Sequence, residues 1–158
     1  MIEEAANRDL FASGARCLVN PVNAAGQPEN GLPNAFFQKY PTMLSGYKGM
    51  CAQGAMRPGR IWEFQDPASG IWIINIPVKQ EAADVTDPQW VDEGLEELAR
   101  FARRMEIMSI ALPAMGCARS GFPFHEFQEL VKKHFTKTCK KVIVYAPLPV
   151  RAARGRRR

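Results

Sequence analysis

Residues 19–31 read VNPVNAAGQPENG, and this stretch decides how the rest of the chain is interpreted. It follows an apolar run, places two asparagines three positions apart at Asn20 and Asn23, and then loses regular periodicity. Asparagine is depleted in strands and common where a side chain bonds irregular backbone. In open α/β sheets, the loops that follow the strands carry the ligands. The stretch therefore marks a candidate ligand loop, although an ordinary turn would also account for it.

Short apolar segments rich in β-forming residues alternate with helical patterns along the chain. Strands are predicted at residues 16–20, 60–64, 71–76, 108–113 and 141–146, and their near-continuous apolar composition is typical of strands buried on both faces. Helices are predicted over 32–39, ended by Tyr40-Pro41, from the cap Asp87-Pro88 onward, and along the amphipathic stretch 124–135. This alternation indicates an α/β fold with helices on both faces of a sheet.

Length and charge indicate a single domain followed by a basic end. The 158 residues are 46% hydrophobic, enough for one core, and the formal net charge is +5. The last eight residues, RAARGRRR, hold five arginines and no acid, so the rest of the chain carries almost no net charge. We expect a domain at 1–148 and a basic, disordered tail at 149–158. The tail either attracts nucleic acid or is a solubilising end without a partner.

Cysteine usage and hydropathy exclude several classes of function. The four cysteines and two histidines show no metal-ligand spacing, so we expect reduced thiols and no structural metal. The start, MIEEAANRD, is acidic, and no apolar run is long enough to span a membrane. We therefore expect a cytoplasmic protein with no membrane contact, and we expect it to be a monomer.

Three segments, in order, carry a family resemblance: VNPVNAAGQPENGLPNAFFQKYP, IINIPVKQ and ALPAMGCARSGFPF. They are similar to VNTVNCVGVMGKGIALQFKKAFP, IINFPTK and the Gly-rich loop IPPLGxGxGGLDW of the macrodomain family, and most closely of its DarG-like branch, which reverses ADP-ribosylation of DNA. The resemblance runs from residue 8 to 147. It implies a three-layer α/β/α sandwich, with a mixed, mostly parallel central sheet, that binds ADP-ribose and needs no metal or cofactor.

The resemblance assigns residues to the adenine end of such a ligand. Asp9, with Leu10 beside it, stands where macrodomains use an acidic or amide residue to bind the adenine amino group. A carboxylate accepts hydrogen bonds, so it suits an exocyclic amino donor. A helix or turn cap is the alternative role for Asp9. Tyr145 lies near the end of the last predicted strand, where it either lines the adenine pocket or packs as a core tyrosine.

Further residues are assigned to the distal ribose and the diphosphate. In the resemblance, Asn23 matches the asparagine that holds the distal ribose. An amide suits vicinal hydroxyls, because it both donates and accepts hydrogen bonds. Asn20 is expected to brace the loop's own backbone. Gly31 lies near the ribose and phosphates. The second loop is expected to hold the diphosphate through backbone N–H groups. The residues assigned to it are Gly116, Cys117, Ala118, Arg119, Ser120, Gly121 and Phe122.

Lys79 is the predicted catalytic residue, since IINIPVKQ resembles the lysine-bearing motif of the family. Pro77 is expected to direct the chain out of the sheet and so to aim Lys79 into the cleft. A neutral lysine would attack the aldehyde of an open-chain ribose and form a Schiff base. A charged lysine would instead stabilise the leaving base. The sequence leaves both roles open, and a solvated surface lysine is the alternative to either.

Two departures from the family bear on function. Glu29 places a carboxylate where the family has glycine, and a carboxylate beside a diphosphate repels it unless the side chain points away. In the second loop, Arg119-Ser120 replaces glycine-rich sequence, and Arg119 is able to offset Glu29 by contacting a phosphate or a nucleic-acid backbone. The first hypothesis is an ADP-ribosyl glycohydrolase acting on modified nucleic acid, with DNA favoured, or on protein. The alternatives are a non-catalytic reader of ADP-ribose or of ADP-ribosylated partners, and a nucleic-acid-binding accessory that acts through the tail.

Overall fold

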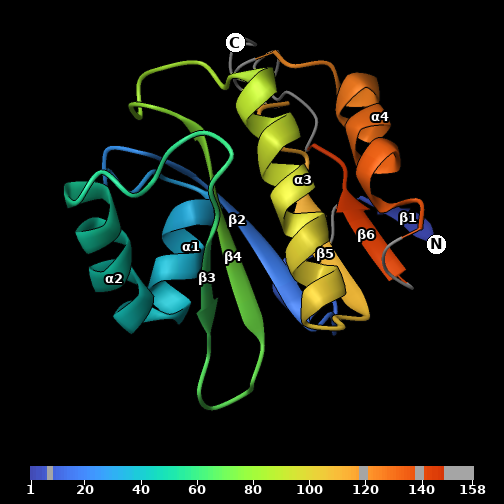
Figure 1. The fold of residues 1–158 in the computed structure, drawn as a ribbon, viewed down its shortest axis with the longest axis horizontal. Coiled ribbons are helices and arrows are strands. Elements are labelled where there is room, and N and C mark those ends of the chain that lie inside the picture. The colour runs from blue at the N-terminus through green and yellow to red at the C-terminus, as the bar shows by residue number, and fades with distance from the viewer. Residues whose placement is uncertain (7–8, 118–120, 138–140, 148–158) are drawn as a thin grey trace, which may run out of the picture.

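The computed structural model describes residues 1–6, 9–117, 121–137 and 141–147. In it, a sheet lies between two layers of helices (Figure 1). The elements are β1 (Ile2–Ala5), a 3₁₀ turn η1 (Leu10–Ala12), β2 (Cys17–Asn23), α1 (Leu32–Lys39), α2 (Pro41–Ala52), β3 (Trp62–Gln65), β4 (Trp72–Lys79), α3 (Pro88–Arg104), β5 (Ser109–Pro113), α4 (Phe124–Phe135) and β6 (Lys141–Tyr145).

The six strands lie in the order β1-β6-β5-β2-β4-β3. All neighbouring pairs are parallel except β3 and β4, which are antiparallel. This confirms the predicted α/β/α sandwich with a mixed, mostly parallel sheet. Because parallel strands point the same way, the segments that follow β1, β2, β4, β5 and β6 meet at one edge of the sheet. No helix of the described ranges is long and apolar enough to cross a membrane.

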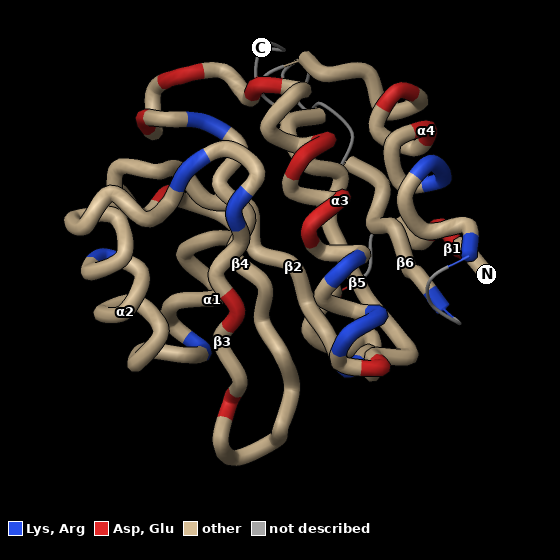
Figure 2. Tube along the Cα trace, viewed as in Figure 1, with Lys and Arg blue, Asp and Glu red and all other residues tan. Residues whose placement is uncertain are grey.

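Each face of the sheet carries its own apolar core. On β4, Ile74, Ile76 and Val78 pack with α3 and α4, whereas Ile73 packs with α1 and α2. The close approach of α3 to β4 depends on Gly94, since a Cβ there would lie 2.4 Å from Cγ2 of the buried Ile76. Figure 2 shows acidic residues along the middle of α3 and basic residues toward its end, where the helix dipole favours positive charge.

The elements β1, α2 and β2 are among those that differ from the sequence prediction. β1 was not predicted, because its sequence IEEA carries exposed carboxylates, which an edge strand tolerates. Tyr40-Pro41 ends α1 as predicted, but a second helix begins at once, since proline is well suited to the first position of a helix. The strand β2 continues to Asn23, three residues beyond its predicted end.

The prediction that Pro77 directs the chain out of the sheet is wrong, because β4 continues through it to Lys79. Proline is tolerated there because Pro77 has a neighbouring strand on one side only. The antiparallel strand β3 pairs with β4 no further than Asn75, and beyond Asn75 the described part of β4 pairs with β2 alone. Strands β2 and β5 are paired at Cys17 and Leu18, and β2 then continues beside β4. The sheet therefore opens between β2 and β5 toward its carboxyl edge.

Candidate functional site

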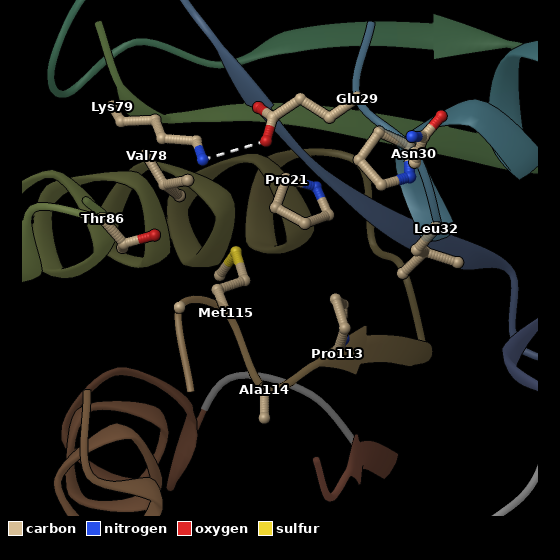
Figure 3. A pocket seen from close by; sticks show the side chains of 12 residues that line it. Pro21, Glu29, Asn30, Leu32, Val78, Lys79, Thr86, Pro113, Ala114 and Met115 are labelled. Carbon is tan, nitrogen blue, oxygen red and sulfur yellow. Dashed lines mark ion pairs between the residues drawn. The ribbon is translucent and has the colours of Figure 1, made fainter. Parts of the chain in front are cut away.

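A cavity of about 220 Å³ lies where β2 and β5 have separated, and we call it the Lys79 cavity (Figure 3). It is built by the ends of β2, β4 and β5, the start of α1 and the segment before α3. Its lining residues are Pro21, Glu29, Asn30, Leu32, Pro33, Val78, Lys79, Thr86, Pro113, Ala114, Met115 and Gly116. The cavity thus joins all three segments that the sequence singled out, as expected for the carboxyl edge of an open sheet.

Lys79 forms an ion pair with Glu29 inside this cavity. Its Nζ lies 2.9 Å from Glu29 Oε1 and donates a hydrogen bond to the carbonyl oxygen of Ala82 at 3.0 Å. Both side chains are mostly buried, with exposed fractions of 13% for Lys79 and 15% for Glu29. Strand alternation explains the direction of Lys79, since its neighbour Val78 packs toward α3 and α4. Glu29 therefore adds no uncompensated negative charge, because the lysine neutralises it.

Asn23 braces the ligand loop, and the sequence had assigned this role to Asn20. The Oδ1 of Asn23 accepts hydrogen bonds from the backbone N–H groups of Ala25 and Gln27, both at 3.1 Å. Its Nδ2 donates to the carbonyl oxygen of Gln27 at 2.7 Å and to Glu29 Oε2 at 2.9 Å. Asn23 is 1% exposed and does not line the Lys79 cavity. Its assignment to the distal ribose remains a prediction.

The correction for Asn20 follows from the extra length of β2. Asn20 lies inside the sheet opposite Asn75 of β4, and its Nδ2 donates to Asn75 Oδ1 at 2.9 Å.

Tyr47 of α2 also supports the ligand loop, because its hydroxyl lies 2.7 Å from the backbone oxygen of Asn23 and 3.0 Å from Asn23 Oδ1. Burial, more than the nearby Cys51 and Glu29, raises the pKa of Tyr47 well above its ordinary value, so the hydroxyl remains a donor.

The ligand loop is also bonded to the segment that follows β4. Gln27 Nε2 donates to Glu81 Oε1 at 3.1 Å, and the N–H of Ala82 donates to Gln27 Oε1 at 3.0 Å. The N–H of Ala24 donates to the carbonyl oxygen of Lys79 at 2.9 Å. Gly31, the residue before α1, lies between the cavity residues Asn30 and Leu32 and has a φ of 87°. These bonds hold Lys79 and the ligand loop in one network.

The two ends of the second loop, at Gly116 and Phe122, are hydrogen-bonded to each other beside the cavity. Gly116 has a φ of 80°, and a Cβ there would lie 2.7 Å from Cβ of Thr86, so this position requires glycine. The N–H of Phe122 donates to the carbonyl oxygen of Gly116 at 3.2 Å, and the Phe122 side chain packs into the core. Cys117 is half-buried, and burial raises the pKa of its thiol to about 11. Gly121 has a φ of 76°.

Three residues assigned to the diphosphate, Ala118, Arg119 and Ser120, lie outside the described residues, so compensation of Glu29 by Arg119 stays a prediction. The predicted tail at 149–158 also lies outside them. Among the described cysteines, Cys17, Cys51 and Cys117 are free thiols. Within the same part of the chain, no group of three His, Cys, Asp or Glu side chains is arranged to hold a metal ion.

Asp9 and Tyr145 meet in a second cavity, which we call the Asp9 cavity. It has a volume of about 470 Å³ and is lined by Glu3, Glu4, Ala5, Ala6, Asp9, Ala12, Ser13, Ile143 and Tyr145. Asp9 caps the turn η1, since its Oδ1 accepts a hydrogen bond from the N–H of Phe11 at 3.0 Å. Leu10 is buried in the core formed with α1 and α2. The cap predicted as an alternative for Asp9 is therefore present, and its contact with adenine stays a prediction.

Sequence reasoning missed the function of two residues in the Lys79 cavity. Glu29 was expected to repel a diphosphate unless its side chain points away, and its ion pair with Lys79 was not predicted. Thr86 was not singled out, although it lines the cavity and packs against Gly116. Ion pairs between residues fifty positions apart leave no local signal, whereas the buried threonine follows an irregular segment in which periodicity is uninformative.

The fold and the two cavities define a three-layer α/β/α domain with candidate ligand sites at the carboxyl edge of a mixed sheet. More particularly, the chain belongs to the Macro domain family, whose model matches residues 19–131.

Named proteins resemble the chain in sequence and in structure. A DNA ADP-ribosyl glycohydrolase of Mycobacterium tuberculosis is 26% identical over 145 residues, which make up 88% of this chain and 40% of that protein. The macrodomain of Thermus aquaticus DarG has a TM-score of 0.85 at 26% identity, covering 93% of this chain and 99% of its own. The macrodomain of Mycobacterium tuberculosis DarG has a TM-score of 0.87 at 26% identity, covering 93% and 98%. The chain spans less than half the length of the curated relatives that it matches.

Proposed function

We propose that this chain binds ADP-ribose and acts as an ADP-ribosyl glycohydrolase on modified DNA. The observation that carries the proposal is the position of Lys79, whose ammonium lies in a cavity between the ligand loop and the second loop, which begins at Gly116 and is called the Gly116 loop from here on. The resemblance to macrodomains assigns the catalytic lysine to this position. The names of the similar proteins, DNA ADP-ribosyl glycohydrolases, support DNA as the substrate over RNA or protein.

The reaction breaks the bond between C1″ of the distal ribose and the modified base. Water supplies the hydroxyl group to C1″ and the proton that the base retains. Of the two roles predicted for Lys79, the charged one fits the geometry, because Lys79 Nζ lies 2.9 Å from a carboxylate oxygen of Glu29 as an ion pair. A cation in a partly buried cavity stabilises negative charge that develops on the leaving base.

The same ion pair favours a second candidate function, a non-catalytic reader of ADP-ribose. If Glu29 holds Lys79 throughout the binding cycle, the lysine does not reach the leaving base and the cavity only binds. The reader and the glycohydrolase make the same contacts with free ADP-ribose. They differ in turnover alone, so binding measurements do not separate them.

The decisive experiment incubates the protein with an ADP-ribosylated DNA oligonucleotide and, in parallel, with an ADP-ribosylated protein, and follows release of free ADP-ribose. Release from DNA that exceeds release from protein is the expected result. Release from protein alone moves the substrate to protein. Binding of ADP-ribose with no release from either substrate identifies the reader, and absence of binding contradicts both functions.

The basic tail is proposed to add affinity for the nucleic acid that carries the modification. Its five arginines hold the whole net charge, and contacts with phosphates weaken steeply with salt. Deletion of residues 151–158 is expected to leave the affinity for free ADP-ribose unchanged and to weaken association with modified DNA at low salt. Equal action of the truncated and complete chains on modified DNA, at low and high salt, contradicts this role.

A further inference from the structure

We infer that Glu29, and not Asn23, binds the vicinal hydroxyls of the ribose that enters the Lys79 cavity, and that it does so side by side with Lys79. The inference rests on the proposed function, since it concerns the recognition of ADP-ribose at the same site. It assigns a specificity-determining role to Glu29, which stands where the macrodomain stretch VNTVNCVGVMGKGIALQFKKAFP has a glycine.

The first step is that Asn23 has no capacity left for a ligand. A primary amide offers two N–H donors and an oxygen with two lone pairs. Both donors are used, toward the carbonyl oxygen of Gln27 and toward Glu29 Oε2. The oxygen accepts from two backbone N–H groups of the loop and lies 3.0 Å from the hydroxyl of Tyr47. A ribose contact at Asn23 would therefore break the loop that forms the cavity.

The second step is that Glu29 keeps acceptor capacity and faces the cavity. Each carboxylate oxygen has about two acceptor positions. With the described residues, Oε1 bonds Lys79 and Oε2 bonds Asn23, so one position on each oxygen is left. Glu29 lines the Lys79 cavity, and Figure 3 shows its carboxylate and the Lys79 ammonium pointing toward one another at one side of it. The two fixed partners hold the carboxylate in place before any ligand arrives.

The third step is the match between this pair and a vicinal diol. The ammonium of Lys79 has three donors, of which one bonds Ala82 and one bonds Glu29. Within the part of the chain that the structure describes, the third donor has no partner, so it is available for a ligand oxygen. The pair thus presents an acceptor and a donor next to each other, and two adjacent hydroxyls satisfy both, one by donating to Glu29 and the other by accepting from Lys79. Phosphate oxygens only accept, so a carboxylate selects for the sugar over the diphosphate.

The experiment measures, by calorimetry, the affinities of the wild type, Glu29→Gln and Glu81→Gln for ADP-ribose and for ADP, which lacks the distal ribose. Glu81 is the matched control, because it bonds Gln27 of the same loop and carries the same charge but does not line the cavity. We expect Glu29→Gln to weaken ADP-ribose binding about tenfold and to leave ADP binding unchanged, since a charged hydrogen bond contributes about that factor. Glu81→Gln should change neither.

An ADP-ribose analogue without the 2″ hydroxyl, and a second one without the 3″ hydroxyl, separate direct contact from a change in loop structure. If Glu29 binds a hydroxyl, Glu29→Gln loses affinity for ADP-ribose but little or none for the analogue that lacks this group. A loop disturbance would weaken all of these ligands alike, and that result overturns the inference. Unchanged or tighter ADP-ribose binding by Glu29→Gln overturns it too, as does an equal change for ADP and ADP-ribose.

The wild type separates this inference from the proposed function. Wild-type protein that binds ADP-ribose and releases it from DNA upholds the proposed function whatever the Glu29 variants do. Wild-type protein that binds no ADP-ribose contradicts both.

Discussion

In the Lys79 cavity the charged groups bond to one another, whereas in the Asp9 cavity Asp9 bonds to the turn that carries it. Lys79, Glu29 and Asn23 come from two strands and a loop, and each holds another in position. Asp9 caps η1 with one carboxylate oxygen. The difference teaches that the first cavity is preorganised, so substitutions there act on several partners at once, while a substitution at Asp9 acts locally.

The largest effect is expected on the rate of ADP-ribose release when Lys79 is replaced. The variant that tests this removes the charges of Lys79 and Glu29 together, so that the net charge of the cavity is unchanged. Lys79→Met alone would leave the Glu29 carboxylate unpaired in a mostly buried place. The double variant Lys79→Met/Glu29→Gln is therefore compared with Glu29→Gln. We expect the double variant to release ADP-ribose from modified DNA at least about 100-fold more slowly, the loss typical for a group that stabilises transition-state charge. Turnover equal to that of Glu29→Gln would exclude Lys79 from catalysis.

Gly116→Ala is expected to destabilise the loop that closes the Lys79 cavity. The substitution forces alanine into a left-handed conformation and places its Cβ 2.7 Å from Cβ of Thr86. We expect a loss of about 2–3 kcal/mol in the free energy of unfolding, measured in urea. Gly121→Ala is the control, because Gly121 has a φ of 76° but no atom of the described residues lies within 4 Å of a Cβ at this position, so strain alone should cost about 1 kcal/mol. Equal losses would show that contact with Thr86 has no effect.

For the Asp9 cavity, two substitutions separate the cap from the adenine contact. Serine is a good cap, whereas alanine is not, and neither has a carboxylate. We expect Asp9→Ser to keep the thermal stability of the wild type and to bind ADP-ribose and ADP about tenfold more weakly, since both ligands carry adenine. Asp9→Ala should lose affinity equally and also about 1 kcal/mol of stability. Wild-type affinity in Asp9→Ser would restrict Asp9 to the cap.

The two loops and Lys79 could be predicted from the sequence, because each lies at or just after the end of a strand, in a local pattern that resembles the family. The ion pair between Glu29 and Lys79 could not be predicted, because it depends on how close the loop before α1 lies to the end of β4 in space. The roles of Asn20 and Asn23 were exchanged for a related reason. The end of β2 decides which asparagine lies inside the sheet and which is the last strand residue beside the loop, and the end of a strand is weakly encoded when its last residues contain proline.

The smallest effect is expected for the stability of the fold away from both cavities, where ion pairs join α4 to α3. Asp92 of α3 lies 2.6 Å from His134 Nε2 and 3.1 Å from Lys133 Nζ, both on α4. Burial alone would raise the pKa of Asp92, but the hydrogen bonds from His134 and Lys133 outweigh it, and the pKa is lowered. Because the folded-state pKa is lowered, the ionised carboxylate stabilises the protein above its unfolded-state pKa of about 3.9, and this contribution is lost as pH falls through the folded-state value.

Asp92→Asn should therefore reduce stability by less than about 1 kcal/mol at pH 6 and by less still at pH 3, because the pair is partly exposed and screened by solvent. Thermal unfolding at both pH values measures the difference. Glu96→Gln, which removes a more exposed carboxylate paired with Arg100 on the same helix, is the control and should show the smaller change. Affinity for ADP-ribose should be unchanged in both variants, since neither residue lines a ligand cavity. A loss of affinity in Asp92→Asn would instead show that the Gly116 loop depends on the anchoring of α4, and the preorganisation of the Lys79 cavity would then extend to the far face of the sheet.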